Sequence, residues 1–246
     1  MSRRFSGRGA SYRAMALYEA IPDLQGEPYI LDALNPSEKS ILLRAGQLIT
    51  FKLGDTLFRQ GDPHGGIFII LSGHVRTYYA APNGREITLA KWPAGHFVGG
   101  PDILGGGQHI WSGEALEPVE VLHLPGQVAR ELTLQCPAFA LALVHALAHK
   151  GRCYSALLQM LATRSVIERL AQVLLNLAER SVDGRSLPLH VSHEELAMLI
   201  GSTRQWVTAS ISRFCKQGVL GREGKQVTIL LPVVLKRLGM GVETDL

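Results

Sequence analysis

The chain has 246 residues, of which 46% are hydrophobic and 19% charged, and its formal net charge is +4. This composition supports a packed core and excludes global disorder, and the length accommodates one large domain or two smaller ones. The net charge is too small to identify a partner. Cys136, Cys153 and Cys215 are too scattered for a disulfide framework or a C-x-x-C metal site. That cysteine usage fits a reducing, intracellular location.

Residues 1–25 are basic, and we expect them to form a flexible arm. No apolar run follows them, so they do not resemble a signal peptide. The longest apolar stretch, around residues 138–147, is too short to span a bilayer. We therefore expect a soluble, cytoplasmic protein with no membrane partner.

Residues 26–136 are predicted to form an antiparallel β-barrel or jelly roll. From about Leu48 to Leu124, short β-prone runs alternate with Gly, Pro and Asn, a spacing typical of such folds. The runs are GDTLF, GIFIILSG, HVRTYYA, REITLAKW, GHFVG and VEVLHLP. Pro82-Asn83-Gly84 separates two of them and predicts a hairpin. The glycine-rich LGGGQ at 104–108 predicts a loop.

Residues 137–163 are predicted to form one long helix, because they contain no proline after Pro137 and a single glycine, Gly151. Five of its apolar residues fall close to a heptad-like stripe: Leu143, Leu147, Tyr154, Leu157 and Leu161. We interpret the stripe as a dimer seam, with packing against the chain's own barrel as the alternative. A second helix is predicted over 166–180, with one apolar face formed by Ile167, Leu170, Leu174 and Leu177. SVDGRS at 181–186 predicts a turn.

Residues 164–246 are predicted to form a winged helix-turn-helix. Ser192-His193-Glu194-Glu195 has the pattern of a capping box, and the helix it begins ends at Gly201, a residue suited to a positive-φ turn. A second helix begins near Ser202 and Thr203. Its Val207, Ile211 and Phe214 recur at i, i+4 and i+7 and are expected to face inward.

The outer face of this second helix predicts DNA recognition. Polar residues at its N-terminal end are placed as on a helix that enters the major groove, where arginine pairs with guanine and glutamine with adenine. VLGREGKQVTILL predicts a two-stranded wing with a basic tip, and between residues 203 and 237 seven Lys or Arg face one acid. The candidate DNA contacts are Ser192, Ser202, Thr203, Arg204, Gln205, Trp206, Thr208, Ala209, Ser212, Arg213 and Lys225.

Taken in order, these elements resemble the CRP/FNR superfamily of transcription regulators. The likeness covers roughly residues 40–238 and rests on GDTLFRQGDP, IFIILSGHVR, GHFVG, LAQVLLNLAER and VSHEELAMLIGSTRQWVTASISRF. It implies an α+β fold with an N-terminal barrel, a long dimerisation helix and a C-terminal winged helix-turn-helix. It also implies a homodimer on palindromic double-stranded DNA, a small effector in the barrel, and RNA polymerase as a partner if the protein is an activator.

The effector positions depart from the cAMP-binding relatives, in which a glutamate and an arginine hold the ribose and phosphate. Gly100 and Ile110 stand at those positions, and a buried phosphate without a cation is unfavourable, so we expect no cAMP binding. An uncharged apolar or aromatic ligand is the hypothesis. Its candidate pocket is Gly99, Gly100, Ile103, Ile110, Trp111, Tyr154 and Ser155. The alternatives are redox control through Cys215 and a regulator without an effector.

The resemblance also bears on cofactors. Oxygen-sensing relatives carry an N-terminal cysteine cluster, and no cysteine precedes Cys136, so no iron–sulfur cluster is expected. CO-sensing members place a histidine where Pro101 stands, which disfavours haem, although barrel histidines leave other haem modes open. They are His64, His74, His96, His109 and His123. No metal site is predicted. A cupin-like enzyme is the remote alternative, disfavoured because no H-x-H, G-x-S-x-G or P-loop occurs.

Overall fold

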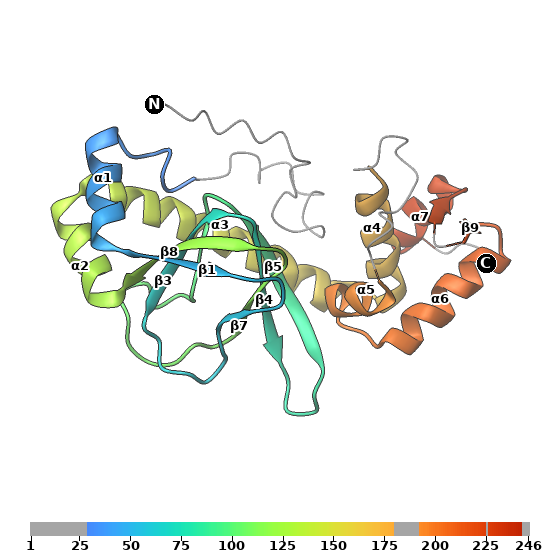
Figure 1. Ribbon diagram of the computed structural model, residues 1–246. Helices are drawn as coiled ribbons and strands as arrows, with labels where there is room; N and C mark the ends of the chain where they lie inside the picture. Colours follow the sequence, from blue (N-terminus) through green and yellow to red (C-terminus); the bar gives the residue numbers. More distant parts are fainter. Residues whose placement is uncertain (1–28, 180–191, 225, 243–246) are drawn as a thin grey trace.

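The computed structural model describes residues 29–179, 192–224 and 226–242. A β-rich domain packs along one long helix, α3 (Pro137–Thr163), and a small helical domain lies beyond the C-terminal end of that helix (Figure 1). The expected arm at residues 1–25 and the expected turn at 181–186 lie outside the described residues.

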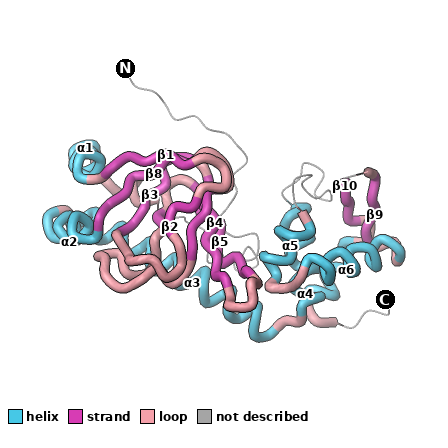
Figure 2. The backbone as a smooth tube through the Cα atoms, turned by 60° about the horizontal axis from the view of Figure 1, so that its bottom comes forward, coloured by secondary structure: helices cyan, strands magenta, loops and turns pink. Residues whose placement is uncertain are grey.

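Two four-stranded antiparallel sheets form the β-rich domain, as predicted, and Figure 2 shows them curved against each other above α3. The first sheet has the order β1-β8-β3-β6 and the second β2-β7-β4-β5. Their bounds are β1 (Gln47–Phe51), β2 (Thr56–Phe58), β3 (Gly66–Ser72), β4 (His74–Ala80), β5 (Glu86–Pro93), β6 (Phe97–Val98), β7 (Ser112–Ala115) and β8 (Val119–Pro125). The predicted runs include neither β1, whose QLITF is nevertheless β-prone, nor the short β7, whose SGEA carries no β-branched or aromatic residue.

The central strand β3 is apolar throughout because both of its faces are covered. Successive side chains of a strand point to opposite faces. Phe68 and Ile70 join the core between the sheets, whereas Ile67 and Ile69 join a second core under the helices. The predicted hairpin is also present, since β4 pairs with β5 and Gly84 takes φ +79° in the connecting turn.

Two helices that the sequence analysis did not predict cover the outer face of the first sheet. They are α1 (Pro36–Ala45) and α2 (Gly126–Gln135). Asn35 caps α1: its side chain accepts bonds from the amides of Ser37 and Glu38, both at 3.0 Å, and Glu38 accepts from the Asn35 amide at 2.8 Å. This reciprocal pattern is a capping box.

The stripe predicted to be a dimer seam instead packs on the chain's own barrel. Leu143 and Leu157 are 1% and 5% exposed in the single chain, and Leu147, Tyr154 and Leu161 are half-buried against the same cores. The assignment of this stripe to the seam is therefore wrong. The reason is that α3 is apolar on two faces, so periodicity alone does not tell which one meets the barrel.

The outer face of α3 carries its own heptad pattern. Leu141, Val144 and Leu158 are 57%, 58% and 68% exposed. With the exposed small residues between and beyond them, they recur at alternating intervals of three and four. The full series, called the outer stripe below, is Leu141, Val144, Ala148, Gly151, Ser155, Leu158 and Ala162. This is the spacing of a coiled-coil seam.

The helices α2 and α3 are the ones whose length and composition bear on whether the chain could span a membrane. In the part of the chain that the structure describes, no single helix is long and apolar enough to cross a membrane. The two helices together meet the length and composition required, but they are bent by 118° at the break between them.

The C-terminal domain consists of four helices and one hairpin within the described ranges. They are α4 (Val166–Glu179), α5 (His193–Ile200), α6 (Arg204–Lys216), β9 (Leu220–Glu223), β10 (Gln226–Ile229) and α7 (Pro232–Gly239). On α4 the predicted apolar face is buried at Leu170 and Leu174, but Ala171 and Val173 on other sides are also fully buried, so the helix is covered on more than one face.

Candidate DNA-binding surface and ligand cavity

The helix-turn-helix consists of α5, a glycine turn and α6. Ser192 caps α5 by accepting a bond from the amide of Glu195 at 3.1 Å, and Gly201 ends it in the left-handed region at φ +65°. Both features agree with the sequence prediction. The second half of the expected capping box is not formed, because the carboxylate of Glu195 pairs with Lys91 of the barrel instead.

The second helix, α6, begins at the cap residue Thr203, whose hydroxyl accepts a bond from the Trp206 amide at 3.3 Å. The predicted inward residues Val207, Ile211 and Phe214 are buried. They fix the rotation of α6 about its axis, so the opposite face points to solvent.

The solvent-facing side of α6 holds most of the candidate DNA contacts. Those exposed are Thr203, Arg204, Gln205, Thr208, Ala209, Ser212 and Arg213, together with Ser192 on α5. Ser202 and Trp206 are half-buried, and Lys225 lies outside the described residues. The Thr208 hydroxyl donates to the Arg204 carbonyl at 2.8 Å. The side chains of Arg204 and Gln205 are exposed at the N-terminal end of α6. Cys215 is half-buried against the core rather than outward.

The predicted wing is the antiparallel pair of β9 and β10. Arg222 on β9 is exposed, and its Nε donates to the Gly224 carbonyl at 3.2 Å. This bond holds the guanidinium beside the turn of the wing, on the same domain as α6. Two separate elements therefore present arginine to solvent.

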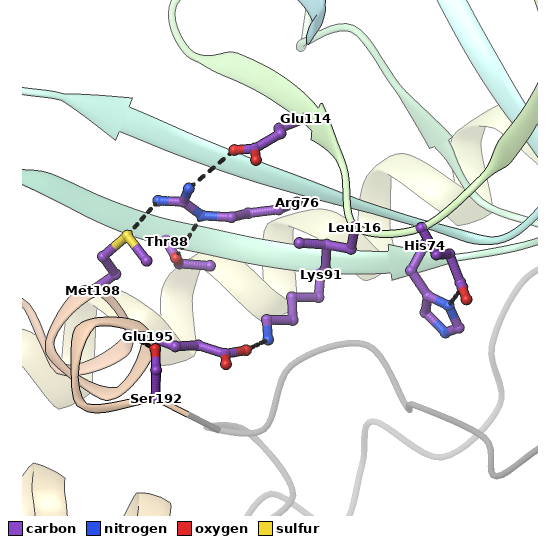
Figure 3. Close-up of a pocket in the computed structure, with 10 residues that line it drawn as sticks. His74, Arg76, Thr88, Lys91, Glu114, Leu116, Ser192, Glu195 and Met198 are labelled. Atoms are coloured by element: carbon purple, nitrogen blue, oxygen red, sulfur yellow. Dashed lines mark hydrogen bonds and ion pairs between the residues drawn. The ribbon is translucent and has the colours of Figure 1, made fainter. Parts of the chain in front are cut away.

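The helix-turn-helix rests on the barrel through α5. Figure 3 shows Arg76 and Lys91 reaching from the second sheet toward Met198 and Glu195. Arg76 Nη2 lies 3.0 Å from Met198 Sδ, and its guanidinium also bonds Glu86 and Glu114 on its own sheet at 2.6 and 3.2 Å. Apart from Glu86, the residues that make these contacts line a cavity of about 410 Å³ between the two domains.

A second cavity, of about 350 Å³, lies between the barrel and α3 and is called the α3 cavity below. Five of the seven candidate pocket residues line it: Gly99, Gly100, Ile110, Trp111 and Tyr154. Ile103 packs against the second core, and Ser155 is exposed on the outer stripe. Those two assignments are corrected. Ser155 follows the cavity residue Tyr154 directly in sequence, and hydrophobic periodicity does not tell which of the two faces the cavity.

Glycine shapes one wall of the α3 cavity. Gly99 and Gly100 take φ +133° and +126°, conformations that L side chains rarely adopt. A Cβ on Gly99 would lie 2.8 Å from the Gly66 carbonyl oxygen. Behind this wall, Nδ1 of His109 donates to the Gly99 carbonyl, and burial lowers the pKa of His109. This wall of the cavity therefore consists of backbone atoms, and the hydrogen bond from His109 holds them in place.

Sequence reasoning missed Lys150, which projects from α3 into the cavity lining and is 7% exposed. Burial lowers its pKa to about 7. Its Nζ lies 3.3 Å from the centroid of the Trp92 ring and 4.7 Å from that of Phe97, so two aromatic faces contact the ammonium group. No cluster of three or more potential metal ligands occurs among the described residues.

Two family models match the chain. The cyclic nucleotide-binding domain matches residues 48–136, and the Crp-like helix-turn-helix domain matches residues 168–238. The CRP-like cAMP-activated global transcriptional regulator of Mycobacterium tuberculosis is 29% identical over 204 residues, which are 81% of this chain and 91% of the relative. The transcriptional activator protein Anr of Pseudomonas aeruginosa is 29% identical over 196 residues, 77% of this chain and 79% of the relative.

The same similarity extends to solved structures. The c-di-GMP responsive global regulator CLP of Xanthomonas campestris superimposes with a TM-score of 0.69, covering 79% of this chain and 99% of that chain at 21% identity, a likeness of fold alone. The barrel and the helix-turn-helix together define a DNA-binding transcription regulator and not an enzyme. The chain belongs to the CRP/FNR family.

Proposed function

We propose that this regulator is a homodimer that binds a palindromic DNA site through α6 and is controlled by a ligand in the α3 cavity. The observation that carries the proposal is the orientation of α6, which buries Val207, Ile211 and Phe214 and turns Arg204 and Gln205 to solvent. An exposed, polar N-terminal end is what a recognition helix presents to base edges. A site on DNA agrees with the cytoplasmic location expected from the sequence, and a contact with RNA polymerase follows if the protein is an activator.

We assign the recognition of the DNA bases to Arg204 and the neutralisation of phosphate charge to the wing. Replacing Arg204 with alanine is expected to cost roughly 1–3 kcal/mol on the cognate site and to relax the preference at one base pair per half-site. The matched variant Arg222→Ala removes an arginine from the wing. It should weaken binding to all sequences alike and reduce the salt dependence by about one charge per contacting subunit.

These variants are compared by titrating cognate and randomised DNA over a range of salt. Equal losses on both DNAs for Arg204→Ala would show that Arg204 contacts phosphate and that the assignment of the reading face is wrong. The half-sites are expected about one helical turn apart, because a twofold dimer presents two recognition helices to one face of the duplex.

The outer stripe of α3 is the proposed dimer seam. In a parallel pair of helices, its Leu141, Val144 and Leu158 would bury apolar surface that the single chain leaves in water. The small residues Ala148 and Gly151 between them permit close approach of the two backbones. Leu158→Glu is expected to give monomers by light scattering and to abolish operator binding. Leu53→Glu is the control, because Leu53 is equally exposed but lies on the barrel, off α3.

A response to cAMP is not expected, although the mycobacterial relative is named as cAMP-activated. The lining of the α3 cavity includes no acid for a ribose, and Gly100 and Ile110 stand where the family's contacts are expected. Calorimetry with cAMP up to about millimolar concentration should show no binding, and a micromolar dissociation constant would overturn this expectation. The proposal includes the division of the chain that the sequence predicts: a barrel domain over residues 26–136, a dimerisation helix over 137–163 and a DNA-binding domain over 164–246.

A further inference from the structure

Lys150 is a buried cation without an acidic partner. No lining residue of the α3 cavity is an aspartate or glutamate, and in the described ranges no carboxylate lies within ion-pair distance of Lys150. Burial is the main cause of the lowered pKa of Lys150, and the electrostatic influence of Cys153, one turn further along α3, opposes it only in part. Buried lysines ordinarily have a counter-charge. The absence of an anionic side chain beside Lys150, among the described residues, therefore requires an explanation.

The rest of the lining is almost entirely apolar. Trp92, Trp111 and Tyr154 form aromatic walls, with the rings of Trp111 and Tyr154 5.4 Å apart. The Thr77 hydroxyl accepts a bond from the indole of Trp92 at 3.2 Å. The cavity lining therefore combines one lysine with hydrocarbon and aromatic surface.

We propose that the α3 cavity binds a small apolar carboxylic acid, whose carboxylate pairs with Lys150 and whose hydrocarbon body lies between Trp111 and Ile110. The inference deepens the proposed function and rests on it only for the effect on DNA. It replaces the uncharged ligand expected from the sequence, because a charge-assisted bond to a buried ammonium strongly favours an anion over a neutral group.

The size and charge of the cavity set the class of ligand. A cavity of about 350 Å³ lies near the lower end of the range for ligand pockets, roughly 300–1,000 Å³, and suits a bicyclic ring or a chain of medium length. A phosphate needs more than one cation or several amide donors when buried. Lys150 is the only cation among the lining residues, which matches the single charge of a carboxylate.

The test uses matched probes and calorimetry on the full chain. The probes are 2-naphthoate and octanoate, each compared with its neutral amide, which has nearly the same shape without the charge. On the natural protein at least one acid should bind at least about tenfold more tightly than its amide. On Lys150→Met the acid should lose that advantage while the amide retains its affinity. Lys52→Met is the control, because Lys52 is exposed on the barrel surface.

Three outcomes would overturn the proposal: neither acid binds, acid and amide bind alike, or Lys150→Met leaves the preference for the acid intact. Because each is measured without DNA, none depends on the proposed function. A second titration measures operator affinity with and without the acid that binds. An acid that binds through Lys150 and leaves DNA affinity unchanged supports the site and contradicts only the control of DNA binding by this ligand.

Discussion

Replacing Lys150 with methionine is expected to stabilise the protein. Methionine has nearly the length of lysine and fills the same channel between Trp92 and Phe97, so packing is largely conserved. Lys150 is 7% exposed, and among the described residues no carboxylate lies within ion-pair distance of the ammonium group that the substitution removes. The substitution therefore removes the cost of burying a charge, and the gain is measurable as an increase in the free energy of unfolding.

The magnitude follows from the change in the pKa of Lys150, from 10.5 to about 7. At about 1.4 kcal/mol for each unit, this corresponds to roughly 4–5 kcal/mol of destabilisation at neutral pH. Loss of the contacts between cation and rings, about 2 kcal/mol when desolvated, offsets part of the gain. The expected net gain is therefore about 3 kcal/mol, or a rise in Tm of roughly 6–12 °C for a chain of this size.

The dependence on pH gives an independent measure. A lowered pKa means that between pH 7 and 10.5 the unfolded chain holds a proton that the folded chain has released. The cost is then complete below about pH 7 and declines as the pH rises toward 10.5. The difference in stability between Lys150→Met and the natural protein should shrink over this range in urea unfolding. Lys52→Met, an exposed control, should change stability by less than about 0.5 kcal/mol.

Two results would refute this reasoning. If Lys150→Met lowers the Tm, the ammonium group makes interactions in solution that outweigh its burial. If the difference in stability is the same at pH 7 and at pH 10, the pKa of Lys150 is not lowered and the group reaches water.

Three further predictions concern the domain contact, the turn and the seam. A double-mutant cycle of Lys91→Met and Glu195→Gln should give a coupling of about 1 kcal/mol in urea unfolding, since the pair is partly buried between barrel and α5; a coupling of zero would show that the pair does not hold the domains together. Gly201→Ala should lower stability by about 1–2 kcal/mol, because φ is +65° there, and an unchanged Tm would contradict that geometry. Gly151→Ala should raise helix stability by up to about 1 kcal/mol, because a Cβ there meets nothing within 4 Å. Sedimentation should nevertheless show a weaker dimer, because the proposed seam uses the small residue for close approach; an unchanged dimer constant would count against the seam.

The barrel was predictable because its signals are local. Alternation and turn residues mark the strands, and Asn83-Gly84 marks one hairpin. The helix α1, which was not predicted, also has a local signal, since Asn35 and Glu38 stand at the spacing of a capping box. The strand β7 had none, because its pairing with β4 fixes it and its own residues do not.

The face of α3 that meets the barrel was not predictable, because both faces are apolar. Leu157 and Leu158 are adjacent in sequence, yet one is buried on the barrel and the other faces solvent. Hydrophobic periodicity finds a stripe but does not say which of two stripes has an intramolecular partner. The same ambiguity concealed Lys150, because a lysine in a helix is ordinarily placed on a solvated face. Its burial depends on Trp92, 58 positions earlier, and only the tertiary structure brings the two together.

The two faces of α3 give the proposed control a physical route. Lys150 and Tyr154 line the cavity, while Ser155 and Leu158 lie on the outer stripe of the same helix, and Gly151 belongs to both. A rigid helix cannot move one face without the other, so an acid that draws Lys150 toward the barrel would also rotate or shift the seam. In the proposed dimer, such a shift would change the separation of the two α6 helices that follow α3 in each chain. The ligand alters DNA affinity only to the extent that it binds the two positions of α3 with different affinity. The ammonium group of Lys150 is the group that can supply such a difference, because an acid pairs with it only where α3 brings the two together.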